Sequence, residues 1–165
     1  MKYLFAMVAL TGLCGLARAE EKLDLHPVEK HMLSCVNAER ARYGLPAFEI
    51  DPNLQNMARR HCAWMTTSRS MVHSNMSVAE NIAMGQQDAS AVTTTWMNSP
   101  GHRANILNGG HRYIGLCGYT ASNGTVFWCQ QFSGGPVLTA VAEAVRTTVN
   151  VATTPARYIL RWWRR

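Results

Sequence analysis

The hydrophobic pattern of this 165-residue chain changes character once, after Asn108-Gly109-Gly110. Upstream of that point apolar residues recur at helical spacing, whereas two β-rich runs follow it, over residues 113–119 and 125–132. The polar segment between the two runs contains Asn123-Gly124, a dipeptide that strongly favours a β-hairpin. Helices that come first and a few strands that come last predict a layered α+β domain rather than a doubly wound parallel sheet.

Local signals mark several helices in the upstream part. A long first helix is expected from about 26 to 43, and a second begins after Asp51, whose side chain can cap it. A third is expected to start near Asp88. Ser99-Pro100 then repeats the cap-plus-proline signal and opens a short helix that runs to Leu107.

Residues 1–19 have the organisation of a secretory signal peptide. Lys2 provides a positive charge, an apolar stretch follows, and Ala17-Arg18-Ala19 forms a small-x-small cleavage site before Glu20. The apolar stretch is too short to span a bilayer well, so an uncleaved membrane anchor is the less favoured alternative. We therefore expect a secreted protein, extracellular or periplasmic.

Four cysteines follow this leader, and an even number in an exported protein predicts two disulfides. A zinc site is disfavoured because no Cys-x-x-Cys pair is present. Four cysteines allow three pairings, so local geometry has to choose among them. The expected hairpin brings Cys117 nearly opposite Cys129, and Cys35 and Cys62 lie on the inward stripes of two neighbouring helices. We expect the bridges Cys35–Cys62 and Cys117–Cys129.

His73, Glu80 and His102 are the residues whose chemistry stands out. Each falls near the edge of an expected element, where a side chain can face a cleft. Two imidazoles and one carboxylate form the ligand set of a catalytic-type zinc site. Their spacing is not a compact motif such as H-E-x-x-H, and for His102 a local hydrogen bond in the first helical turn is the alternative.

A series of short segments between about residues 28 and 134 follows one family's order. They are Val36 to Arg40, Gly44-Leu45-Pro46, Asp51 to Leu54, His73-Ser74, Ala79 to Gly85, Trp96 to Leu107, Ile114-Gly115 and Phe127 to Phe132. In these segments the chain resembles bacterial members of the CAP superfamily, the cysteine-rich secretory, antigen 5 and pathogenesis-related 1 group. The resemblance places a CAP-like (SCP-like) domain at residues 26–134.

The resemblance implies a three-layer α-β-α sandwich with a small antiparallel sheet and a central groove. Members typically hold two histidines and two acidic residues there, and several bind divalent metal. His73, Glu80 and His102 match three of these positions. Ser99 and Pro100 stand where many relatives have the second acid, which predicts at most weak binding of zinc or another divalent cation. Ser99 is then expected to line the groove as a hydrogen-bond donor.

These observations favour a secreted, non-enzymatic domain that binds a small ligand, a lipid or a cell-envelope component in this groove. The alternative is a divalent-metal-dependent extracellular hydrolase that uses the same residues. No serine or cysteine triad is recognisable in the sequence, so catalysis ranks second.

Residues 135–165 are expected to form a linker and a basic tail rich in tryptophan and arginine. The chain's net charge of +6 is concentrated there, which disfavours nucleic acid as a partner. Interleaved tryptophan and arginine suit contact with an anionic membrane surface, and the alternative is that the tryptophans fold back onto the domain. The expected contact residues are Arg157, Arg161, Trp162, Trp163, Arg164 and Arg165.

Overall fold

The computed structural model describes residues 23–137, so the expected leader and the C-terminal tail lie outside the described residues. The chain forms four helices and four strands in this range. In order they are α1 (Pro27–Arg42), β1 (Glu49–Ile50), α2 (Pro52–Ser68), β2 (Ala79–Met84), α3 (Ala89–Met97), α4 (Pro100–Ile106), β3 (Tyr113–Thr120) and β4 (Val126–Ser133). The four helices and the hairpin predicted from the sequence are confirmed.

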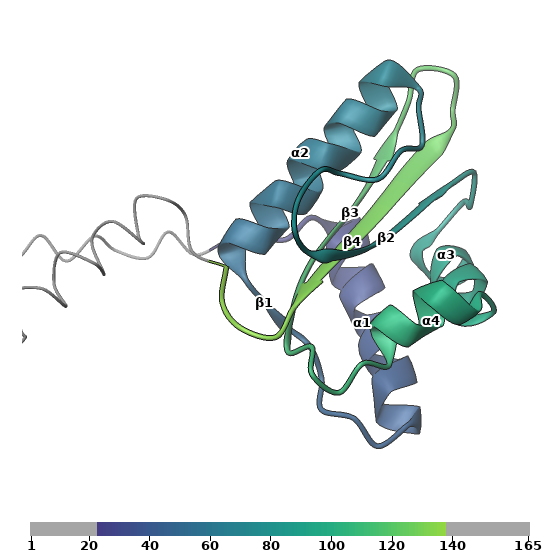
Figure 1. The fold of residues 1–165 in the computed structure, drawn as a ribbon. Coiled ribbons are helices and arrows are strands. Elements are labelled where there is room, and N and C mark those ends of the chain that lie inside the picture. Colours follow the sequence, from purple (N-terminus) through teal and green to yellow (C-terminus); the bar gives the residue numbers. More distant parts are fainter. Residues whose placement is uncertain (1–22, 138–165) are drawn as a thin grey trace, which may run out of the picture.

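One sheet holds all four strands in the order β1-β3-β4-β2 (Figure 1). β3 and β4 form the antiparallel hairpin, β2 is antiparallel to β4, and the two-residue β1 is parallel to β3. Gly124 has a φ of 83°, which fits the tight turn of the hairpin. The small antiparallel sheet is therefore confirmed, with one short parallel strand added at its edge.

The helices cover the two faces of the sheet unequally (Figure 1). α2 packs on one face, against β3 and β4, whereas α1, α3 and α4 lie on the other. Two apolar clusters fill the gaps: one joins α1, α3 and α4 to the sheet around Trp96 and Trp128, and one joins α2 to the hairpin. This arrangement is the predicted three-layer α-β-α sandwich.

The two-sided arrangement corrects one predicted disulfide. Cys35 belongs to α1 and Cys62 to α2, and the sheet separates these helices, so the prediction of a Cys35–Cys62 bridge is wrong. Cys117 and Cys129 do face each other across the hairpin, which confirms their predicted register. All four of these cysteines carry free thiols in the structure.

α2 lies close to β3 because of two residues. Gly115 faces the α2 backbone, where a Cβ atom would collide with the main chain of Leu54 and Gln55. The buried Gln55 side chain donates to the Leu116 carbonyl at 2.7 Å and accepts from the Leu116 amide at 2.9 Å. Gln55 therefore takes the place that a neighbouring strand would occupy on this part of β3.

Arg40 ties the loops at the end of α1 to the rest of the domain. Its guanidinium is buried and donates hydrogen bonds to four backbone carbonyls, those of Pro46, Ile106, Asn108 and His111. These carbonyls belong to segments far apart in sequence, so a single side chain joins the loop before β1 to the loop before β3. Among residues 23–137, no helix is long and apolar enough to cross a membrane.

Replacing Gly115 by alanine should destabilise the protein strongly. The added Cβ meets helix backbone, which cannot move aside as a side chain can, so we expect a loss of about 3 kcal/mol in the free energy of unfolding. Equilibrium urea unfolding measures the change. Gly101→Ala is the matched control, because its Cβ would meet no atom within 4 Å and helical alanine is favoured over glycine. Equal stability of the two variants would contradict the proposed close approach.

Candidate ligand-binding site

Glu80 lies at the centre of the candidate site, on the face of β2 that looks toward α2. Its carboxylate is almost fully buried and is held on both oxygens. Oε1 accepts from His73 Nδ1 at 2.8 Å and from the Ser74 amide at 2.9 Å, and Oε2 accepts from Gln131 Nε2 at 2.8 Å. Gln131 is the direct cross-strand partner of Glu80, so the register of β2 on β4 creates this contact.

The protonation state of Glu80 follows from two opposed effects. Burial raises the pKa of the carboxyl, because the charged form loses water. Hydrogen bonds from Gln131, Ser74 and His73 favour the charged form and together outweigh burial, so the pKa lies below its ordinary value. Glu80 is therefore ionised at neutral pH.

His73 presents one ring nitrogen to solvent. Because Nδ1 donates its proton to Glu80, the neutral ring carries its lone pair on Nε2. The side chain is 62% exposed, so Nε2 is accessible to a ligand. The carboxylate thus fixes both the orientation and the tautomer of this imidazole.

His61 is a site residue that the sequence analysis missed. It comes from α2, with Nε2 at 2.9 Å from the Val72 carbonyl and 3.9 Å from Glu80 Oε1. Its ring stacks on Trp64, with ring centroids 5.9 Å apart and planes 10° apart. One signal in the sequence could have indicated His61. It directly precedes the inward-facing Cys62, so it lies at the edge of the buried stripe of α2.

His102 and Ser99 lie in and before the short helix that the sequence analysis expected, and their role in the groove stays a prediction. His102 lies in α4, and no hydrogen bond or ion pair joins its side chain to Glu80 in the described part of the chain. Burial, followed by the neighbouring His73, lowers the pKa of the His102 ring, which favours the neutral form. Ser99 is the N-cap residue of α4, and its hydroxyl makes no capping hydrogen bond.

Two asparagines connect α4 to the strand that carries Glu80. Asn105 Nδ2 donates to Asn81 Oδ1 at 2.9 Å and to the Glu80 carbonyl at 3.3 Å. The buried Asn81 in turn donates to the His102 carbonyl at 3.1 Å. Helix α4 therefore supports the backbone of the site from the opposite face of the sheet.

The residues do not fit the expected metal site. Within residues 23–137, no three histidine, cysteine, aspartate or glutamate side chains are gathered so that they could hold a metal ion. Both oxygens of Glu80 already accept hydrogen bonds from the protein. The predicted zinc ligand set of His73, Glu80 and His102 is therefore not assembled in the described part of the chain.

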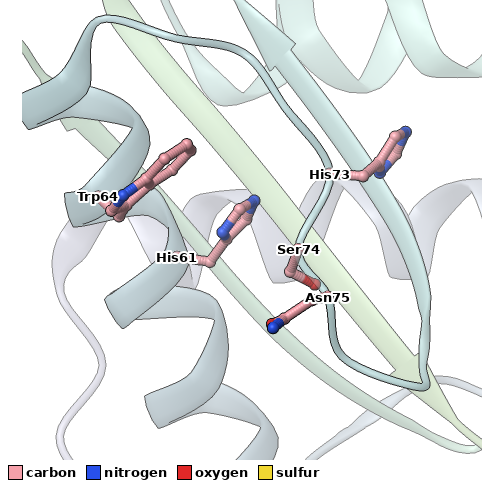
Figure 2. Close-up of a pocket in the computed structure, with 5 residues that line it drawn as sticks. All are labelled: His61, Trp64, His73, Ser74 and Asn75. Carbon is pink, nitrogen blue, oxygen red and sulfur yellow. The ribbon is translucent and has the colours of Figure 1, made fainter.

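A pocket of about 360 Å³ opens beside this cluster (Figure 2). His61 and Trp64 line it from α2, and His73, Ser74 and Asn75 line it from the segment that leads into β2. Trp64 is 50% exposed, so one aromatic wall is open to a ligand. A second hollow of about 200 Å³ shares His61, Ser74 and Asn75 with it and is completed by Met57, Arg60 and Met76.

The depressed pKa of Glu80 predicts an acid-dependent stability. The Glu80 carboxyl has a lower pKa in the folded protein than in the unfolded chain, where it is about 4.3. Its ionised form therefore stabilises the folded protein above about pH 4.3, and this stabilisation is lost as the pH falls through the folded-state pKa. Glu80→Gln removes this contribution and places an amide N–H against donors, which should cost about 1–3 kcal/mol at neutral pH. Urea unfolding at several pH values should show the two proteins converging in acid.

Glu49→Gln is the control for this measurement, because Glu49 is an exposed carboxylate paired with Arg112. Its substitution should leave the pH dependence of stability nearly unchanged. A constant difference between wild type and Glu80→Gln down to about pH 3 would show that Glu80 is not the titrating group.

The comparisons with known proteins agree with this architecture. The family model of the cysteine-rich secretory protein family, CAP, matches residues 33–132. The uncharacterized protein YkwD of Bacillus subtilis (strain 168) is 36% identical over 123 residues, which cover 64% of this chain and 47% of the relative. The chain thus spans about half the length of that relative.

Solved structures share the fold at low sequence identity. An outer surface protein from Borrelia burgdorferi superposes with a TM-score of 0.60 at 20% identity, covering 67% of this chain and 94% of that one. An extracellular protein containing an SCP domain from Bacillus anthracis str. Ames gives a TM-score of 0.57 at 23% identity, covering 68% and 45%. Because the family model spans more than half of the sequence and the three-layer fold agrees with it, the chain belongs to the cysteine-rich secretory protein (CAP) family.

Proposed function

We propose that the protein is an exported, non-enzymatic binding domain. Its pocket between α2 and the segment before β2 takes a small ligand, a lipid or a cell-envelope component. The observation that carries the proposal is that one pocket is lined by a half-exposed indole, Trp64, and by His73, whose ring is held in place by Glu80. Such a pairing of an apolar wall with a few placed polar groups is typical of small-molecule sites.

Apolar side chains near the pocket strengthen this proposal. Met71, Val72 and Met76 lie in the segment between α2 and β2, and each is about half exposed. Of these, Met76 lines the neighbouring hollow, and covering exposed apolar side chains is favourable at about 25 cal/mol per Å². A ligand with both an apolar and a hydroxyl-bearing part would use both features.

The state of Glu80 favours binding over catalysis. Its carboxylate is ionised and engaged by three nitrogen donors, so its role is to orient His73 rather than to transfer protons itself. The divalent-metal-dependent hydrolase ranks second, since its ligand set is not gathered among the described residues.

Export is part of the proposal. It is supported by the signal-peptide organisation of residues 1–19 and by the descriptions of two structural relatives, one as extracellular and one as an outer surface protein. We therefore place the protein outside the cytoplasm, in the extracellular space or the periplasm.

Trp64→Ala should weaken ligand binding by at least about tenfold, equivalent to about 1.4 kcal/mol, because it removes the open aromatic wall. His73→Ala should have a comparable effect, because it removes the polar side chain that lines the pocket and that Glu80 holds in place. Isothermal titration calorimetry with a soluble muropeptide and, separately, with palmitate measures both variants and distinguishes an envelope-glycan ligand from a lipid.

Tyr43→Ala is the matched control, since Tyr43 is an aromatic residue of equal exposure that does not line the pocket. Its affinity should equal that of the wild type. The assignment of this pocket would be refuted if the wild type bound neither probe. It would also be refuted if the Tyr43 and Trp64 variants lost affinity equally.

We also propose that the tail adds attachment to an anionic membrane surface. Arg157, Arg161, Arg164 and Arg165 would each contribute about 1 kcal/mol near such a surface, and Trp162 and Trp163 prefer the headgroup region. Deleting residues 156–165 should abolish co-sedimentation with vesicles that contain phosphatidylglycerol. If truncation leaves vesicle binding unchanged but lowers the melting temperature, the tail is part of the folded domain and the anchor proposal fails.

A further inference from the structure

Three of the four cysteines in residues 23–137 share one buried cluster. Cys62 of α2, Cys117 of β3 and Cys129 of β4 are fully inaccessible to solvent and pack together between α2 and the hairpin. Cys35 is separate from them, on α1 beyond the sheet, and is partly exposed. A cluster of three thiols allows one internal disulfide and leaves one thiol over.

Hydrogen bonds to backbone carbonyls fix where two of these sulfurs lie. Cys117 Sγ donates to the Ala58 carbonyl of α2 at 3.3 Å. In an α-helix that same carbonyl accepts the amide of the residue four positions later, which is Cys62. The Cys117 sulfur therefore lies beside the Cys62 backbone. Cys62 Sγ donates in the opposite direction, to the Phe127 carbonyl of β4 at 3.0 Å, so its side chain points at the sheet.

The alternative pairing across the hairpin has poorer geometry. Residues that face each other on antiparallel strands, as Cys117 and Cys129 do, have Cβ atoms about 4.5–5.5 Å apart. A disulfide needs a Cβ separation of about 3.5–4.5 Å, so this bond would pull the strands together. Cys129 Sγ also has another neighbour, Glu80 Oε2, at 4.0 Å.

We propose that Cys62 and Cys117 form a disulfide that joins α2 to β3, and that Cys129 remains a buried thiol against Glu80. The bond forms by exchange with an oxidant of the disulfide class: the two protein thiols become one S–S bond, and the oxidant's disulfide is reduced to two thiols. This pairing replaces both bridges expected from the sequence. It depends on the proposed export only for its oxidising surroundings.

The bond would control the wall of the pocket. Cys62 directly follows His61 and lies two residues before Trp64, so a link from Cys62 to β3 holds both pocket residues at a fixed distance from the sheet. Burial raises the pKa of the Cys117 thiol well above its usual value, and a hydrogen bond with the Cys62 thiol raises it further. Thiolate is then scarce in the folded protein, so exchange is slow and the bond forms during folding.

Peptide mapping tests the proposal independently of export and of any ligand. The full chain is refolded in a glutathione redox buffer. Iodoacetamide then labels the thiols that are accessible in the folded protein, and N-ethylmaleimide in denaturant labels the buried thiols. The protein is digested without reductant. We expect a Cys62–Cys117 peptide, iodoacetamide on Cys35, and N-ethylmaleimide on Cys129. A link between Cys117 and Cys129, any link to Cys14 or Cys35, or four free thiols at these positions would overturn the proposal.

Serine variants supply the matched controls. Cys129→Ser should keep the disulfide, and reductant should lower its melting temperature as it does for the wild type. Cys62→Ser should contain no disulfide, and its melting temperature should not respond to reductant. Survival of a disulfide in Cys62→Ser would refute the pairing. The peptide map of the wild-type protein decides the question by itself, so a variant that fails to fold does not affect the test.

Discussion

The docking of α2 on β3 is the contact on which the rest of this structure depends. Beyond Ile114, no strand among residues 23–137 pairs with β3 on its β1 side, because β1 pairs with Tyr113 and Ile114 alone. The Leu116 amide and carbonyl would be buried without partners there, at a cost of about 1–3 kcal/mol each, and the Gln55 side chain satisfies both. Gly115 makes the approach possible, because any side chain at that position would collide with the helix.

That contact sets the distance between α2 and the sheet, and the candidate site is built in the same layer. His61 and Trp64 lie on α2 beyond Gln55, and they face the segment that carries His73 and Ser74. Glu80 receives hydrogen bonds from this segment and from Gln131 of β4. The carboxylate therefore joins separate parts of the chain, and its burial is tolerated because each of its oxygens has a donor.

Glu80 also orients an exposed member of the cluster. Glu80 uses its charge to hold Nδ1 of His73, which fixes the orientation of this exposed ring. On the opposite face of the sheet, Asn81 and Asn105 anchor the β2 backbone to α4. Preorganisation of this kind reduces the conformational entropy that the site's side chains would otherwise lose when a ligand binds.

The sequence by itself determined the helices, the hairpin and two members of the site. Caps and prolines marked α2 and α4 because those signals act within a few residues, and Asn123-Gly124 marked the turn for the same reason. It did not predict β2, whose residues Ala79 to Met84 are poor in β-branched and aromatic types and form a strand only through pairing with β4. His61 lies beside Glu80, and Cys35 lies on the other side of the sheet from Cys62, because each position depends on which face of the sheet a helix covers. Local propensity does not encode that choice, and only the packing of the layers decided it.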